Sequence, residues 1–158
     1  MKRSLLILVI VLLNCCVAVA QDINGFWKGS LTMVGCFPEN NIELQINTRN
    51  GQLSGDSYHY QDINNYVKKK FLGRYDMGLK KLYVREGMVT TYHIPQRCVI
   101  CVKDFDLVYS KKGNEETLSG NWSGIQLGNG RDCNGGAIVL TLSGPPGARE
   151  FLAALFDS

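Results

Sequence analysis

The sequence has few histidines and none of the common catalytic motifs. Serine-hydrolase, zinc-protease, phosphate-loop and calcium-loop motifs are all missing. His59 and His93, the only histidines, have no metal or catalytic partner at a fixed spacing, and we interpret them as surface or pocket-rim residues. Asp104 and Asp106 alternate with Phe105, so we expect both to face water rather than converge as a carboxylate pair. We therefore expect no enzymatic activity, no cofactor and no metal.

The sequence also lacks a second long apolar run, so it predicts no transmembrane segment. Its one such run, Leu5 to Leu13, follows a basic start and precedes Ala18-Val19-Ala20, a small-residue cleavage site. This order is typical of a secretory signal peptide over residues 1–20. We therefore predict export to the periplasm, the outer surface or the medium. The alternative is a lipoprotein signal in which Cys15 or Cys16 carries the lipid.

Net charge is also low. Two of the 17 Lys and Arg residues lie in the signal peptide, so 15 remain against 14 acidic residues, a mature charge of +1. Such a balance gives no reason to expect nucleic acid as a partner. Residues 21–158 are long enough to bury a core as a single domain. The sequence specifies no oligomeric state.

Four cysteines remain after cleavage: Cys36, Cys98, Cys101 and Cys133. An even number in an exported protein indicates disulfides. In an extended strand the α-carbons of Cys98 and Cys101 would lie about 10 Å apart, beyond the limit of roughly 7 Å for a direct bridge. We predict that one of them pairs with Cys133 and the other with Cys36. The less favoured alternatives are a four-cysteine zinc site and a redox pair.

Helical periodicity is missing from the interior of the chain, whereas period-two alternation recurs. Its clearest example is Leu118 to Gly124, where Leu, Gly, Trp and Gly alternate with polar residues. Asn50-Gly51 is a strong hairpin signal. We predict an all-β fold, an eight-stranded antiparallel up-and-down barrel with a possible short C-terminal helix over residues 149–156, and a sandwich as the alternative. The expected strands span residues 23–34, 42–48, 52–60, 66–76, 79–94, 98–110, 117–124 and 137–142.

Glycines are expected to shape these strands. Gly29, Gly55, Gly73 and Gly120 lie at comparable mid-strand positions, which fits the sharp bends of a small barrel. Gly87 lies inside the long strand over residues 79–94, where we expect a bulge rather than a turn. Leu82, Val84, Met88 and Tyr92 are expected to share one face of that strand.

Gly25-Phe26-Trp27 matches the G-x-W of a lipocalin's first strand. With the expected meander, the mature chain resembles the calycin group, which includes lipocalins and avidins. The lipocalin T-D-Y motif is missing, Arg149 is the only candidate to cover Trp27, and the biotin-holding residues of avidins do not line up. The chain is also similar to small exported proteins of Bacteroidota.

Seven residues are candidates for the barrel interior. The resemblance to lipocalins implies that they line a cavity for a small apolar or aromatic ligand. If they instead fill the barrel, the alternative is a cell-envelope interaction or structural protein without a ligand. The candidates are Trp27, Leu31, Phe71, Tyr75, Tyr92, Tyr109 and Trp122.

Positive charge is concentrated on one expected hairpin. We interpret this patch as a solvated outer face, the alternative being a surface for an anionic partner. Its members are Lys68, Lys69, Lys70, Arg74, Lys80, Lys81 and Arg85.

Overall fold

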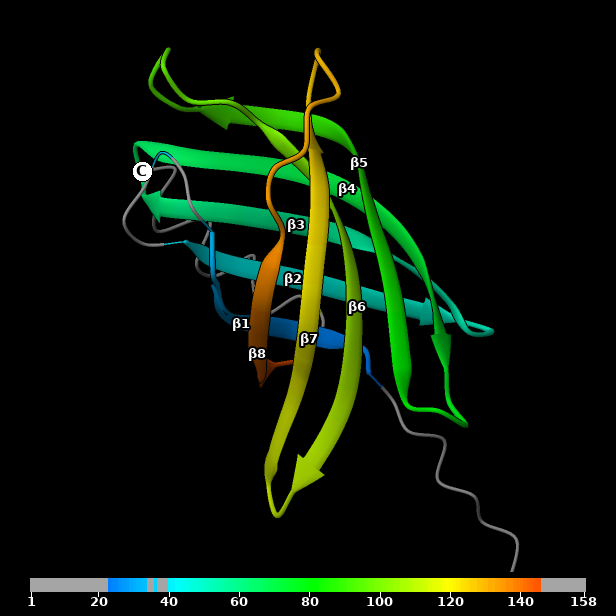
Figure 1. Cartoon of the computed structure of the whole chain (residues 1–158). Helices are drawn as coiled ribbons and strands as arrows, with labels where there is room; N and C mark the ends of the chain where they lie inside the picture. The colour runs from blue at the N-terminus through cyan, green and yellow to red at the C-terminus, as the bar shows by residue number, and fades with distance from the viewer. Residues whose placement is uncertain (1–22, 34–35, 37–39, 146–158) are drawn as a thin grey trace, which may run out of the picture.

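The computed structural model describes residues 23–33, 36 and 40–145. Over these residues the protein is all-β, with eight antiparallel strands that close into a barrel in sequence order (Figure 1). The expected signal peptide and C-terminal helix lie outside the described residues. The strands are β1 (Gly25–Leu31), β2 (Asn41–Arg49), β3 (Gln52–Asp62), β4 (Asn65–Asp76), β5 (Lys81–His93), β6 (Cys101–Lys112), β7 (Glu115–Gln126) and β8 (Gly136–Gly144).

The alternating pattern places one face of each strand in the core. In β2, Ile42, Leu44 and Ile46 are fully buried. Strands β2–β4 cross β6–β8 steeply (Figure 1), so opposite walls pack face to face. Trp27 packs edge-on against Tyr109, with 6.3 Å between ring centroids. The lower part of the barrel is therefore filled by side chains.

The β2–β3 hairpin confirms the Asn-Gly signal. Asn50 and Gly51 both have positive φ, 51° and 75°, as a two-residue turn that matches the twist of its strands requires. This turn sets the register, in which Arg49 pairs with Gln52 and Asn41 with Tyr60.

Strand β5 is a single bent strand, as predicted (Figure 1). Its pairing with β4 shifts register around Gly87, between Glu86 and Val89. The expectation that Met88 and Tyr92 share the inward face is wrong: they are 66% and 59% exposed. The bulge changes the alternation, and β5 pairs with β6 only from Lys81 to Arg85, so its later half leaves the core.

Replacing Gly120 with alanine is expected to cost about 1–3 kcal/mol of unfolding free energy, because overpacking forces backbone shifts. A Cβ at Gly120 would lie 2.0 Å from the carbonyl oxygen of Asp106 on β6. Gly87→Ala is the matched control, since a Cβ there meets its nearest atom at 3.9 Å. Urea unfolding of both variants measures the difference. Equal stability of the two would contradict the role assigned to Gly120.

Candidate functional site

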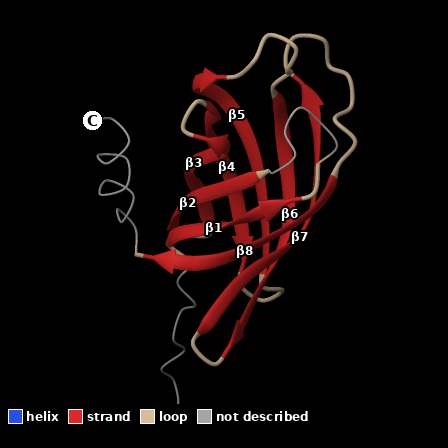
Figure 2. Ribbon diagram, turned by 90° about the vertical axis from the view of Figure 1, so that its left-hand side faces the viewer, coloured by secondary structure: helices blue, strands red, loops and turns tan. Residues whose placement is uncertain are grey.

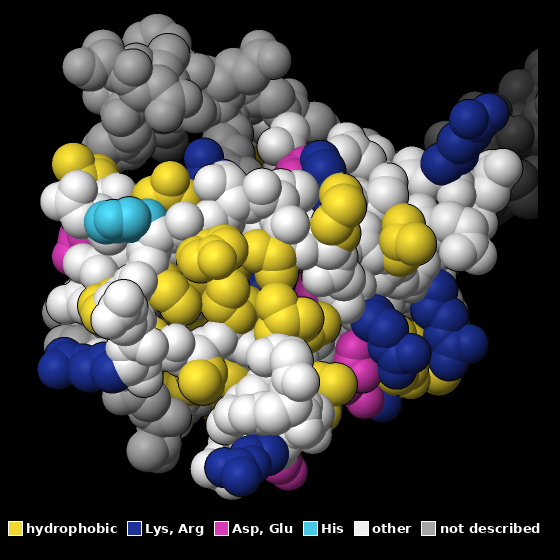
Figure 3. Space-filling view, turned by 90° about the horizontal axis from the view of Figure 1, so that it is seen from above, with side chains coloured by type: hydrophobic (Ala, Val, Ile, Leu, Met, Phe, Trp, Pro, Cys, Tyr) yellow, Lys and Arg dark blue, Asp and Glu magenta, His cyan; other side chains and the backbone are white. Residues whose placement is uncertain are grey.

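A cavity of about 540 Å³ opens at one end of the barrel. The connections β5–β6 and β7–β8 lie together at this end (Figure 2). Seen from above, hydrophobic side chains gather at the centre of the face (Figure 3). The wall is largely apolar and includes Leu31, Met33, Val67, Ile94, Val99 and Ile100.

Two disulfides hold the cavity rim. Cys36 pairs with Cys98, joining the β1–β2 connection to the β5–β6 connection. Cys101 pairs with Cys133, joining the start of β6 to the β7–β8 connection. The predicted pairing of Cys98 and Cys101 with separate partners is thus confirmed. All four cysteines line the cavity, so the bridges fix its walls directly.

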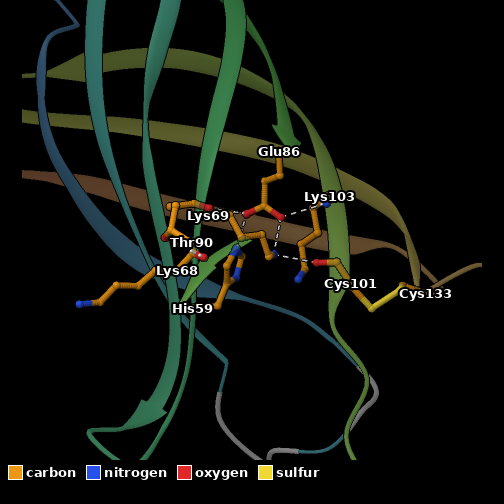
Figure 4. A network of polar contacts seen from close by, with 9 residues as sticks. His59, Lys68, Lys69, Glu86, Thr90, Cys101, Lys103 and Cys133 are labelled. Atoms are coloured by element: carbon orange, nitrogen blue, oxygen red, sulfur yellow. Dashed lines mark hydrogen bonds and ion pairs between the residues drawn. A yellow bond between two sulfur atoms is a disulfide. The ribbon is translucent and has the colours of Figure 1, made fainter. Parts of the chain in front are cut away.

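A buried polar cluster forms the inner wall of the cavity (Figure 4). Its centre is the carboxylate of Glu86 on β5, whose side chain is fully buried. It accepts hydrogen bonds from Ser57 Oγ at 2.7 Å, Lys69 Nζ at 2.5 Å and His59 Nε2. A fourth comes from the backbone N–H of Lys103 at 3.0 Å. A buried carboxylate needs such partners because its desolvation is costly.

The cluster lies where the ladder between β5 and β6 stops. Arg85–Asp104 is the last paired position, so the next N–H on β6, that of Lys103, has no carbonyl of β5 opposite it. The Glu86 side chain accepts from that N–H, and Lys69 Nζ donates to the Cys101 carbonyl at 2.7 Å. The Glu86–Lys69 ion pair thus satisfies backbone groups that strand pairing leaves free.

Protonation in the cluster follows from burial and neighbouring charge. Burial lowers the pKa of His59 to about 3, so the ring is neutral and donates from Nε2 to Glu86. Burial alone would raise the pKa of Glu86, but His59 and the Lys69 ammonium hold it well below its ordinary value. Glu86 is therefore ionised and Lys69 is its counter-ion.

Lys103 is the member of the cluster whose side-chain amine forms no hydrogen bond with the other members. The residue is 4% exposed, and its Nζ lies over Trp122, 5.2 Å from the ring centroid. Among the described residues its ammonium has no hydrogen-bond or ion-pair partner. Burial and the nearby Lys69 lower its pKa to about 7, against the opposing effect of Glu86.

The predicted interior residues separate into three groups. Leu31 lines the cavity. Tyr92 is exposed, which corrects its inward placement. The other five belong to the buried core: Trp27, Phe71, Tyr75, Tyr109 and Trp122.

The charged patch is mostly an outer face, with one correction. Lys70 pairs with Asp56 and Arg85 with Asp104 at the surface, but Lys69 is 1% exposed. Alternation along β4 carries the signal that was missed, since Lys69 shares the face of Val67 and Phe71. The interpretation of the whole lysine run as a solvated face overlooked the inward position of Lys69.

His59 lines the cavity, which agrees with the pocket-rim interpretation and not with the surface one. It lies within β3 and, unexpectedly, contacts Glu86. Lys103 was missed altogether, although it shares the inward face of Phe105. Asp106 is exposed and Asp104 has a 48% exposed side chain, which confirms their outward direction.

No protein-family model matches the chain, and no curated protein or solved structure is significantly similar to it. Over the described residues, no group of three or more His, Cys, Asp or Glu side chains could hold a metal ion. The part of the chain that the structure describes contains no helix long and apolar enough to cross a membrane.

Proposed function

We propose that this protein is an exported binding protein that holds a small molecule with an apolar or aromatic body in the cavity and does not transform it. The observation that carries the proposal is the cavity itself. Its 540 Å³ falls within the range of small-molecule sites, roughly 300–1,000 Å³. Apolar walls with a few buried polar groups are the usual composition of such sites.

Two further features support the proposal. The bridges Cys36–Cys98 and Cys101–Cys133 hold the cavity walls, and a preformed site loses less conformational entropy on binding. The same bridges are compatible with an oxidising, extracytoplasmic compartment. Side chains fill the end of the barrel away from the cavity, so the ligand is confined to the end with the β5–β6 and β7–β8 connections.

A cavity-filling variant tests the proposal. The neutral fluorophore N-phenyl-1-naphthylamine is expected to bind the wild-type protein with increased emission. Val67→Phe should lower its affinity by about tenfold or more, equivalent to 1.4 kcal/mol, because Val67 lines the cavity. Leu72→Phe, at a 70% exposed position on the same strand, should bind like wild type.

If wild type fails to bind the probe, or if both variants bind it equally, the cavity is not the site. That result would favour the alternative, a cell-envelope protein that acts through its outer surface.

A further inference from the structure

We propose that the ligand of the cavity is an apolar molecule with a single carboxylate, which binds against Lys103 while that side chain takes up one proton from solution. This inference rests on the proposed function and specifies its ligand class. It follows from the charge of the cluster, from the hydrogen bonds already made, and from the position of Lys103.

The charge of the buried cluster is unbalanced when Lys103 is protonated. Glu86 and Lys69 form one neutral pair at 2.5 Å, and His59 is neutral. The Lys103 ammonium then adds one positive charge in a largely apolar site. Arg97 and Asp132, on the connections above, also line the cavity and carry one charge of each sign. A buried charge without a partner is costly, so one negative charge from a ligand would complete the cluster.

The hydrogen bonds select Lys103 as the group that meets the ligand. Glu86 already accepts from Ser57, His59, Lys69 and the Lys103 N–H. Lys69 already donates to Glu86 and to the Cys101 carbonyl. Within the described part of the chain, Lys103 Nζ has no hydrogen-bond or ion-pair partner and lies over the face of Trp122. It is therefore the buried donor on the cavity wall that is left for a ligand.

A single carboxylate fits this arrangement better than a dianion. Glu86 lies directly behind the site, so a second negative charge would find no buried cation to balance it. The apolar wall formed by Leu31, Met33, Val67 and Ile100 accommodates the rest of the molecule. Its head would point inward to Lys103 and its apolar body toward the mouth.

Proton uptake follows from linkage. Lys103 in the empty cavity is about half protonated near pH 7. A bound carboxylate favours the charged form and raises the pKa of Lys103. Glu86 from β5, Lys69 from β4 and His59 from β3 are the charged and titratable groups that face the same space; Glu86 stays ionised and His59 neutral over this range. Above pH 7, binding must therefore be accompanied by uptake of a proton from solution at Lys103, and each pH unit weakens binding by up to tenfold.

The test compares decanoate with decanol, two ligands with the same chain length. Calorimetric titration of wild-type protein at pH 6 should give decanoate about tenfold or more higher affinity, since a hydrogen bond to a charged group is worth roughly 1.5–3 kcal/mol. From pH 6 to pH 9 decanoate affinity should fall by up to about a hundredfold, while decanol affinity stays constant. Titrations at pH 8 in buffers of different ionisation enthalpy should show uptake of close to one proton.

Two variants assign these effects to Lys103. Lys103→Met should abolish both the preference for decanoate and the proton uptake. Lys103→Arg should retain the preference but lose the uptake, because guanidinium stays protonated throughout this range. Lys68→Met, on the outer face of β4, is the matched control. If either Lys103 variant fails to fold, the wild-type pH profile and proton count still decide the question.

The outcomes separate this inference from the proposed function. Equal affinity for the two ligands without proton uptake would overturn the carboxylate while leaving the binding site intact. Binding of neither ligand nor the neutral naphthylamine would overturn the site itself. Proton uptake that persists in Lys103→Met would overturn the assignment to Lys103.

Discussion

Replacing Glu86 with glutamine is expected to lower the free energy of unfolding by about 3–5 kcal/mol, the usual cost of removing one partner of a buried ion pair. The change leaves the Lys69 ammonium buried at 1% exposure without a counter-ion. It also weakens the acceptor of the Lys103 N–H, at the point where strand pairing ends. Urea unfolding followed by tryptophan fluorescence measures the loss.

Two controls make this result specific. Asp104→Asn removes a carboxylate on the outer face of β6 that pairs with Arg85; the two side chains are 48% and 79% exposed. An exposed pair of this kind is worth about 1 kcal/mol or less. The double variant Glu86→Gln/Lys69→Met removes both charges and should regain part of the loss. A loss no larger for Glu86→Gln than for Asp104→Asn would contradict the central role of Glu86.

The effect of Glu86 should also depend on pH. Its folded-state pKa is lowered, so its stabilising contribution is complete above its ordinary value of 4.5 and is lost as the pH falls through the folded-state pKa. The stability difference between wild type and Glu86→Gln should therefore shrink in acid. A difference that grows in acid would indicate that Glu86 is protonated in the folded protein.

Removing the bridge between Cys101 and Cys133 should cost about 4 kcal/mol, on the loop-entropy relation for a separation of 32 residues. It should also weaken binding at the cavity. The bridge holds the β7–β8 connection against the start of β6, and the carbonyl of Cys101 accepts from Lys69. Thermal unfolding of Cys101→Ala/Cys133→Ala, with titration of the neutral naphthylamine, measures both effects.

The bridge between Cys36 and Cys98 provides the comparison. Its separation of 62 residues gives a similar entropic term, also about 4 kcal/mol, but it lies on the rim and away from the polar cluster. Cys36→Ala/Cys98→Ala should lose similar stability while keeping more of the carboxylate preference. If the two double variants lose that preference equally, the link between Cys101 and the cluster is wrong.

The strands could be predicted from sequence because one face of each is buried. Ile42, Leu44 and Ile46 show this directly, and Asn50-Gly51 fixes a turn by its backbone preference. Strand geometry predicted that Cys98 and Cys101 have separate partners, because they cannot reach each other along one extended strand, but it left open which of them pairs with Cys36. Strand alternation and turn residues are local sequence patterns, and they can therefore be recognised without knowing the rest of the fold.

The polar cluster could not be predicted in the same way. Alternation places Lys69 beside Val67 and Phe71, and Lys103 beside Phe105, but nothing local shows that β3, β4, β5 and β6 bring these groups to one carboxylate. The Gly87 bulge also obscured the direction of the side chains that follow it. The cavity also depends on the β5–β6 and β7–β8 connections. These loops lack the hydrophobic alternation from which side-chain directions could be predicted.

The side-chain hydrogen bonds that replace strand pairing beside Glu86 bear on how a barrel avoids adding a strand from another molecule. A strand whose N–H and C=O groups lose their neighbour is a template for adding a strand from another molecule, and so for aggregation. At this gap the Lys103 N–H and the Cys101 carbonyl are already occupied by Glu86 and Lys69. The two strands can thus diverge beside the cavity without offering a pairing edge to a second chain. In protein design, a buried ion pair across two diverging strands is therefore a way to open a pocket without leaving unpaired backbone groups that promote aggregation.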